Sequence, residues 1–294
     1  MFLALLAGAA IAAAGTASFV VLNHGRPAGA MVVVTNGDSV FVRYHHVDRQ
    51  RGPRSETRYR VVSGAVLGGA TWNLPLYGPD TLVRGQPADR FDVARDTASW
   101  LERDSTRRAP FSRSSFYRLR SFTPYDQWLL VRHLMRQPSW TSTTLPAGTA
   151  RAEAVVTRTV RGKSGPLRAR FVVVWPAGTT TYPPGVWIDD KGELIAGQVA
   201  WFIPVRRGSE DLLPQLREAE VGWRDAQGEA LAKRLAPAPA STVAIVNGDV
   251  FDSERGVVRP RTTVLVRGER IIAVGPADSV PVPAGARVID AAGK

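Results

Sequence analysis

Short runs of β-branched and aromatic residues alternate with turn-forming residues from residue 19 to about residue 201. Runs separated by pairs such as Asn36-Gly37 and Gly52-Pro53 are typical of strands that are joined by tight turns. Strands joined by such short connections pair in antiparallel fashion. The pattern therefore predicts an antiparallel sheet built from FVVLN, VVVTN, SVFVRYHHV, TRYRVV, AVVTRTV, ARFVVVW, GVWI and ELIAGQVAWFIPV.

Two segments interrupt this alternation with a helical pattern. In residues 123–137, Thr123 suits the N-cap and Pro124 suits the first turn, where no backbone donor is needed. Residues 209–235 begin with acidic and end with basic side chains, as the helix dipole favours. The expected fold class is mainly β (α+β), with an antiparallel β-rich domain over residues 18–235 that contains two helices.

The stretch APAPAS at residues 236–241 predicts a linker, because alternating prolines hold the backbone semi-extended. About four strand-like runs follow in residues 242–294. Two of them are expected to form a hairpin through Gly268-Glu269, since glycine accepts the positive φ that a two-residue turn requires. A sheet of about fifty residues is marginal in isolation, so this segment predicts only part of a domain.

Residues 2–22 carry no charged side chain, and LALLAGAAIAAA has the length of a signal-peptide core. We predict that residues 1–17 are a signal peptide and that the protein is exported to the periplasm or the exterior of a bacterial cell. No basic residue precedes the apolar run, which argues against this interpretation. The alternative is an uncleaved membrane anchor, since about 20 apolar residues can span a bilayer.

Basic residues outnumber acidic ones by 38 to 26, which gives a net charge of +12. Nucleic-acid-binding proteins usually concentrate such charge on one face and interleave aromatic residues. Here the arginines are spread from Arg26 to Arg287, so we expect no nucleic-acid partner. The denser RQRGPR at residues 49–54 is a candidate clamp for a phosphate or an acidic ligand, with a solvated loop as the alternative.

The chain has no cysteine, which excludes disulfides, cysteine-bound zinc, thiol nucleophiles and iron–sulfur clusters. Its four histidines are scattered. His45 and His46 are adjacent, so on a strand they point to opposite faces and cannot hold one ion together. His24 and His133 are expected at the surface or in packing. The sequence therefore predicts no catalytic, cofactor-binding or metal-binding residue in this chain.

Several shorter motifs have both a chemical and a structural interpretation, and the structural one is favoured in each case. The Gly-Asp-Ser within residues 36–39 resembles an esterase nucleophile, but a hairpin turn explains it better. Residues 162–164, Gly-Lys-Ser, lack the earlier glycine of a phosphate-binding loop and are also expected to form a turn. The carboxylate pairs Asp189-Asp190 and Glu218 with Glu220 are expected to be a solvated turn and a solvated helix face.

Eight tryptophans could line a concave ligand-binding surface, because aromatic walls are common in binding sites. The favoured alternative is that they fill the core of the first domain. They are Trp72, Trp100, Trp128, Trp140, Trp175, Trp187, Trp201 and Trp223.

Four stretches follow one another in a specific order near the end of the sequence: IVNGDVFD at 245–252, VLVRGERI at 264–271, AVG at 273–275 and PAGARVID at 283–290. Together they resemble the opening of the amidohydrolase superfamily, metal-dependent hydrolases that include imidazolonepropionase-like enzymes. A weaker resemblance, to a module that precedes this point in some exported amidohydrolases, rests on residues 48–53, 145–148 and 186–192.

The resemblance implies that residues 242–294 form part of a small composite β-sandwich that precedes a catalytic TIM-like barrel. It further implies a parent enzyme that hydrolyses carbon–nitrogen bonds other than peptide bonds in a small-molecule substrate, with a divalent metal, zinc being favoured. The family's His-x-His metal pair does not occur in this sequence, so no functional residue carries over. We therefore expect an inactive N-terminal fragment, truncated before the barrel. The alternative is a stand-alone periplasmic ligand-binding or interaction module built on residues 18–235.

Overall fold

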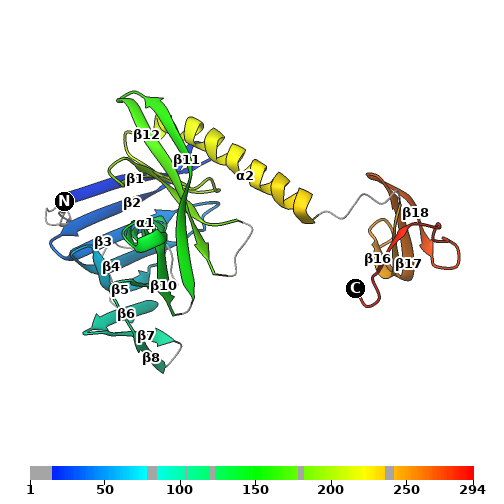
Figure 1. Ribbon diagram of the computed structural model, residues 1–294, viewed down its shortest axis with the longest axis horizontal. Helices are drawn as coiled ribbons and strands as arrows, with labels where there is room; N and C mark the ends of the chain where they lie inside the picture. Colours follow the sequence, from blue (N-terminus) through cyan, green and yellow to red (C-terminus); the bar gives the residue numbers. More distant parts are fainter. Residues whose placement is uncertain are drawn as a thin grey trace, which may run out of the picture. The chain divides into compact units, whose positions relative to one another are not determined.

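The computed structural model describes residues 15–77, 85–102, 105–119, 123–146, 148–177, 182–235 and 242–294. The chain divides into two compact units, Met1–Gln227 and Gly228–Lys294 (Figure 1). The boundary falls inside helix α2 (Leu213–Leu235), shortly before the predicted linker. That linker, residues 236–241, and residues 1–14 of the predicted signal peptide lie outside the described residues.

The described part of the first unit contains one sheet with the strand order β8-β7-β6-β5-β4-β3-β2-β1-β15-β14-β13-β12-β11-β10-β9. Neighbouring strands are antiparallel throughout, except for the parallel pair β9 and β10. The mainly β, antiparallel fold with two α-helices is thus confirmed. In chain order the strands are β1 (Gly15–Asn23), β2 (Arg26–Asn36), β3 (Ser39–His46), β4 (Arg54–Val62), β5 (Ala65–Asn73), β6 (Asp89–Ala94), β7 (Thr97–Glu102), β8 (Ser105–Pro110), β9 (Ser115–Tyr117), β10 (Thr141–Leu145), β11 (Thr149–Gly162), β12 (Gly165–Pro176), β13 (Gly185–Asp189), β14 (Leu194–Gly197) and β15 (Ile203–Arg206).

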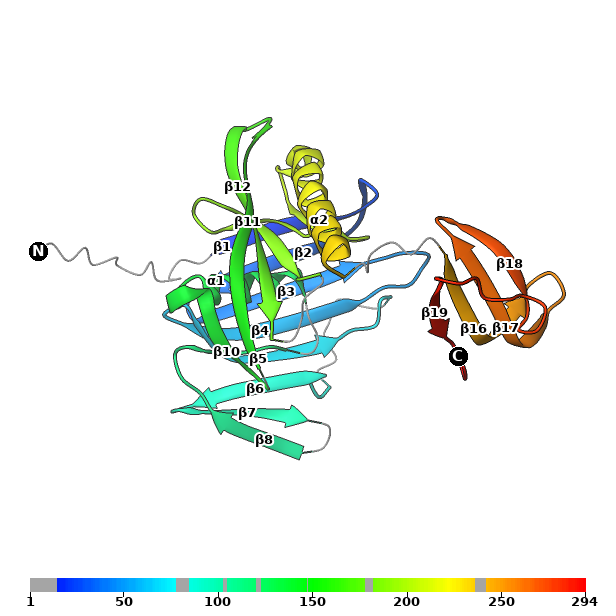
Figure 2. The ribbon, with the colours of Figure 1, turned by 45° about the vertical axis from the view of Figure 1, so that its right-hand side comes forward.

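Helix α1 (Pro124–Leu134) lies within the curve of this sheet (Figure 2). Its buried side chains share one hydrophobic core with residues of β1–β7 and of β9–β14. The helix begins as the sequence predicts: Thr123 is the N-cap, and Thr123 and Asp126 form a reciprocal capping box. Met31, Phe91 and Leu134 are among the fully buried side chains of this core.

A second core covers the other face of the sheet. Successive residues of β1 serve both cores, because side chains alternate along a strand: Phe19 and Val21 face the first core, whereas Val20 and Leu22 face the second. The 3-10 helix η2 (Glu210–Leu212) and α2 pack on this second face, with Leu216 fully buried. The central strands are therefore buried on both sides.

The start of β1 differs from the predicted domain start at residue 18. Gly15 is paired with Thr35 and Ala17 with Val33, so residues 15–17 belong to an internal strand of the sheet. Among the described residues, no helix has the length and apolar character needed to cross a membrane.

Two features of the strand pattern were not anticipated. The run ELIAGQVAWFIPV, expected as one strand, forms β14 and β15, which are separated by residues 198–202. Strands β5–β10 were not expected, because no strand was predicted between residues 62 and 154. The clearest case is that of β6–β8. Their outward positions carry Arg90, Asp92 and Arg107, so they lack the continuous β-branched character on which the prediction depended.

The second unit contains a four-stranded sheet with the order β18-β17-β16-β19. Strands β17 and β18 form the predicted hairpin, whose turn is Gly268-Glu269 with a positive φ of 59° at the glycine. Strand β19 pairs with β16 in parallel fashion. A small core of Ala244, Leu265 and Val280 lies on one face. The strands are β16 (Val243–Asp252), β17 (Val257–Arg267), β18 (Arg270–Pro276) and β19 (Arg287–Asp290).

Candidate functional site

The histidines are dispersed over the first unit. His24 lies in the β1–β2 turn with a φ of 47°, and His45 is exposed on β3. His46 points to the opposite face of β3, where its ring stacks on Phe202 at 3.7 Å. The opposite orientation of His45 and His46 agrees with the prediction. In the part of the chain that the structure describes, no group of three or more histidine, aspartate or glutamate side chains could hold a metal ion.

Within the described ranges, His133 and Ser142 form a histidine–serine contact that resembles catalytic chemistry. His133 Nε2 lies 3.0 Å from Ser142 Oγ, and the Ser142 hydroxyl also bonds to the carbonyl of Ser114. Both residues are buried, and burial lowers the pKa of His133 below its ordinary value. A nucleophile must be reached by its substrate. The pair therefore has a structural role, in which α1 is joined to β10.

The two carboxylate pairs, predicted to be a solvated turn and a solvated helix face, differ in how well the structure agrees with the prediction. Asp189 accepts hydrogen bonds from the backbone N–H groups of Lys191 and Glu193, so this pair lies in a turn, as predicted. Glu218 is exposed, but the prediction of a solvated position was wrong for Glu220, whose side chain is fully buried. Residues two apart on a helix do not face each other, so Glu218 and Glu220 cannot act as a pair.

The two remaining motifs are turns, as expected. Asn36 pairs with Ser39 across the β2–β3 hairpin, with Gly37 and Asp38 between them. Gly162 pairs with Gly165 at the end of the β11–β12 hairpin.

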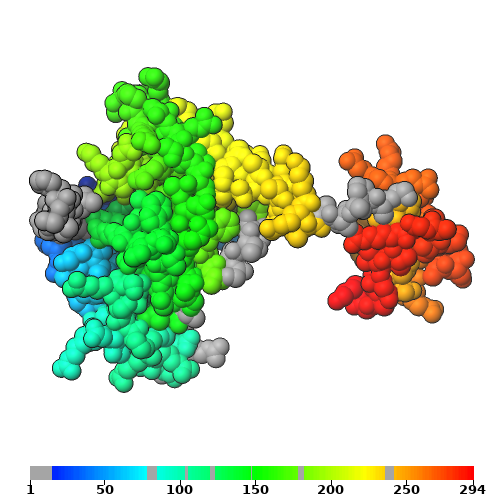
Figure 3. Space-filling view, in the orientation of Figure 1, coloured from blue at the N-terminus to red at the C-terminus, as the bar shows by residue number. Residues whose placement is uncertain are grey.

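The tryptophans mostly fill the cores. Trp100, Trp128 and Trp187 are buried, and Trp140, Trp175 and Trp223 pack against the two cores. Trp201 is 72% exposed. The face of the first unit seen in Figure 3 shows no deep hollow among the green segments, which include β10–β12. The tryptophans therefore do not gather around one concave surface.

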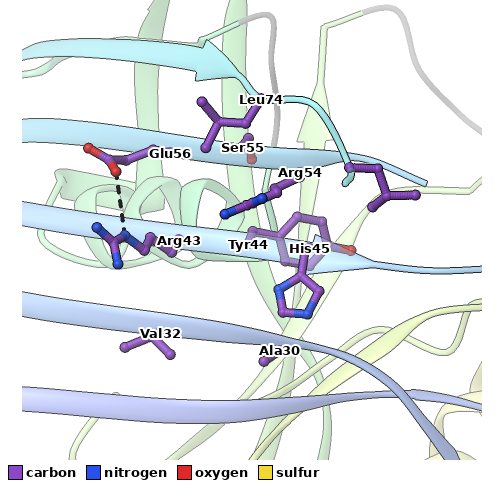
Figure 4. Close-up of a pocket in the computed structure, with 10 residues that line it drawn as sticks. Ala30, Val32, Arg43, Tyr44, His45, Arg54, Ser55, Glu56 and Leu74 are labelled. Atoms are coloured by element: carbon purple, nitrogen blue, oxygen red, sulfur yellow. Dashed lines mark hydrogen bonds and ion pairs between the residues drawn. The ribbon is translucent and has the colours of Figure 1, made fainter. Parts of the chain in front are cut away.

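A pocket of about 360 Å³ opens on the face of β2–β4 that is turned away from α1 (Figure 4). Its polar side chains come from neighbouring strands, with Arg43 and His45 on β3 and Arg54 and Glu56 on β4. Apolar walls are provided by β2 and by the segment that follows β5. The residues that line it are Ala30, Val32, Arg43, Tyr44, His45, Arg54, Ser55, Glu56, Leu74 and Leu76.

Glu56 is the only acidic side chain in this lining, and its carboxylate is already engaged. Arg58 donates two hydrogen bonds, of 3.0 and 2.9 Å, to Oε1, while Arg43 donates one of 3.4 Å to Oε2. The Arg58 guanidinium also lies over the rings of Phe41 and Trp72, at 5.2 and 5.3 Å from their centroids. Glu56 is therefore paired with two arginines, Arg58 at 2.9 Å and Arg43 at 3.4 Å.

Only one arginine of the candidate clamp at residues 49–54 reaches this pocket. Arg49 and Arg51 are exposed in the turn after β3, whereas Arg54 is half-buried and donates a hydrogen bond to the Pro75 carbonyl at 3.5 Å. Sequence reasoning missed Arg43. The sequence did contain a pattern that places Arg43. Phe41, Arg43 and His45 alternate along β3 with three buried residues, so they share the outer face of the strand.

The second unit has a different feature, an exposed apolar row across all four strands. Ile289 is paired with Ile245, Ile245 with Val264, and Val264 with Val274. Residues paired across strands project from the same face of a sheet. This face is opposite to the one that holds Ala244 and Leu265, since side chains alternate along each strand.

Comparisons of the chain with protein-family models, with curated proteins and with solved structures find no match.

Proposed function

We propose that the chain is the N-terminal portion of an exported, metal-dependent amidohydrolase, in which residues 242–294 supply the first strands of a composite β-sandwich. The parent enzyme would hydrolyse carbon–nitrogen bonds other than peptide bonds. The four ordered stretches between Ile245 and Asp290 support this proposal, as does their arrangement, since each contributes to a strand or a turn of one small sheet.

The apolar row Ile289–Ile245–Val264–Val274 is the observation that carries the proposal. Val274 and Ile289 are 44% and 41% exposed, and Ile271 on the same sheet is 66% exposed. A soluble sheet normally buries its apolar face against a second layer, because each Å² of apolar surface removed from water contributes about 25 cal/mol. A row of four aliphatic side chains is therefore suited to pack against further strands.

The opposite face of this sheet is already covered in part. Val280 and Ala286, which follow β18, pack there against Ala244 and Leu265. The proposed second layer therefore belongs on the face of Ile245 and Val264.

The metal site is assigned to a later part of the parent enzyme, after the segment that resembles the family's opening. The residues described here offer no cluster of ligands for an ion. Under this proposal the first unit is an accessory domain, and the 294-residue chain with added zinc should not hydrolyse amide, lactam or cyclic-imide substrates.

Reading the coding DNA beyond Lys294 tests the proposal most directly. An open reading frame that continues with a Pro-Gly segment and a His-x-His pair is the expected result. A stop codon directly after Lys294, or zinc-dependent hydrolysis by the 294-residue chain, would overturn it.

A further inference from the structure

A groove of about 660 Å³ lies in the first unit between the β1–β2 hairpin and the start of α2. Its floor is formed by Val20 and Leu22 of β1, which project from the face of the sheet that α2 covers. Leu213 and Pro214, in the first turn of α2, form a side wall. The groove therefore offers an apolar surface of the size of a small-molecule site.

Hydrogen bonds show how α2 lies along β1. The backbone N–H of Arg207, shortly before the helix, donates to the carbonyl of Ser18 at 2.9 Å. Further along the helix, Glu220 accepts the backbone N–H of Val199 at 3.0 Å, and Val199 lies just beyond the strand end at which β15 pairs with Leu22. The helix therefore runs along β1 from its Ser18 end toward its Leu22 end.

The charged side chains of the groove are divided between its two ends. Arg207 and Glu210 line the end near the start of α2, where their charges oppose each other. Arg217 lines the groove further along the helix, toward the turn of the β1–β2 hairpin that contributes His24. Since residues three and four apart share a helix face, Arg217 projects beside the apolar wall of the first helical turn. The end of the groove at Arg217 thus holds a cation and no acidic lining residue.

Arg217 is available to a ligand. Its side chain is exposed, and among the described residues no acidic side chain forms an ion pair with it. Glu220, three positions further along α2, is fully buried and already accepts hydrogen bonds from Trp187, Val199 and Arg224. A guanidinium has five N–H donors in a planar fork that matches the two oxygens of a carboxylate.

The shape of the floor indicates an elongated ligand. Val20 and Leu22 follow each other on one face of β1, and with a rise of about 3.3 Å per residue the strand covers about 13 Å from Val20 to His24. A ligand that fits combines an extended apolar chain with one anionic group at the Arg217 end.

We propose that this groove binds a medium-chain fatty acid, whose aliphatic chain lies along Val20 and Leu22 and whose carboxylate is bound by Arg217. The site is independent of the amidohydrolase proposal, because it lies wholly in the first unit and needs no metal.

Titration calorimetry on the 294-residue chain tests the proposal with decanoate as the probe. Decan-1-ol, which has the chain without the charge, and acetate, which has the charge without the chain, are the controls. Decanoate should bind saturably and at least tenfold more tightly than either control, since each CH₂ group that is buried strengthens binding about fourfold. Binding of decanoate that is no tighter than that of decan-1-ol, or no tighter than that of acetate, would overturn the proposal.

Variants of the groove locate the binding. Arg217→Gln should weaken binding of decanoate at least fivefold and leave that of decan-1-ol unchanged. Leu213→Asp should abolish binding of decanoate, because it places a negative charge in the apolar wall, while the helix dipole favours an acid in the first turn. Circular dichroism and urea unfolding establish that each variant is folded.

Two further variants are controls for binding elsewhere on the chain. Arg113→Gln, at an exposed arginine between β8 and β9, should leave binding unchanged, as should the double variant Val264→Thr/Val274→Thr in the apolar row of the second unit. If Arg113→Gln weakens binding as much as Arg217→Gln does, or if the double variant abolishes it, decanoate binds outside the groove and the assignment is wrong.

Discussion

The indole Nε1 of Trp187 donates a hydrogen bond of 3.1 Å to the carboxylate of Glu220, and both side chains are completely buried. The same carboxylate accepts hydrogen bonds from the backbone N–H of Val199 at 3.0 Å and from Arg224 Nε at 2.9 Å. The Glu220 carboxylate therefore joins α2 to Trp187 on β13 and to Val199 in the segment after β14, and it also bonds to Arg224 within α2. Burial raises the pKa of Glu220, and these hydrogen bonds oppose that shift.

Replacing Glu220 should destabilise the first unit. Glu220→Ala removes the acceptor of Arg224 Nε, of the buried Trp187 Nε1–H and of the half-buried Val199 N–H. Breaking a buried charge pair typically costs about 3–5 kcal/mol. Glu220→Gln retains an acceptor oxygen and should cost less. Urea unfolding followed by tryptophan fluorescence is the measurement, because all eight tryptophans belong to the first unit. The exposed Glu218→Ala is the matched control and should change stability by less than about 0.5 kcal/mol; equal losses for both would contradict the assigned role.

Asp126 should make the stability of the first unit depend on pH. Complete burial raises the pKa of Asp126 to about 8, while its bond to the Thr123 backbone N–H opposes the shift. Because the folded pKa exceeds the unfolded one, the contribution of Asp126 to stability is fully present below about pH 4 and is lost as the pH rises toward 8. Asp126→Asn keeps the cap acceptor without this titration. The stability difference between variant and wild type should grow with pH, by at most about 1.4 kcal/mol per unit, up to about pH 8; a constant difference from pH 5 to 9 would contradict this.

His133 should make the stability of the first unit depend on pH in the direction opposite to that of Asp126. Burial lowers its pKa, so the folded state favours the neutral ring. Its contribution is therefore fully present above about pH 6.5 and is lost as the pH falls through the folded pKa. His133→Gln preserves a side chain that can bond to Ser142 but does not titrate. The unfolding free energies of wild type and variant should differ by a constant amount above pH 7 and converge or cross below pH 6. Parallel curves over the whole range would show that the ring does not titrate on unfolding.

The exposed row of the second unit should bind hydrophobic dyes. Val264→Thr combined with Val274→Thr keeps the β-branched shape that suits a strand but makes the β17–β18 half of the row polar. Fluorescence of an anilinonaphthalene dye with the 294-residue chain should fall by more than half. Val34→Thr, at a 40% exposed valine of β2, is the control and should have little effect. Equal dye binding by all three proteins would mean that the row is not an accessible apolar surface.

The position of β1 makes a prediction about export. Cleavage after Ala17 would remove Gly15, Thr16 and Ala17, which pair with Thr35, Val34 and Val33. We therefore expect a mature chain that begins at or before Gly15 when the protein is exported. Mass spectrometry of the periplasmic product measures this. A product that starts at Ser18 and unfolds at the same urea concentration as the longer chain would contradict the expectation. An intact Met1 on all of the protein would contradict cleavage of a signal peptide.

The local features of this protein could be predicted from its sequence, because they depend on interactions within a few residues. The turns at Asn36-Gly37 and Gly268-Glu269 follow from the conformational preferences of their residues. The N-terminus of α1 follows from Thr123 and Pro124, and the opposite orientation of His45 and His46 follows from the two-residue period of a strand.

The tertiary structure alone decided which residues meet across the sheet. Nothing near Glu220 in the sequence indicates burial, since its partner Trp187 lies 33 residues away. The β2–β4 pocket likewise depends on a register that pairs His45 with Arg54 and Arg43 with Glu56. Such contacts are set by strand pairing and by the packing of α2, which involve residues far apart in the chain, so the local pattern determined the elements but not the site that they form.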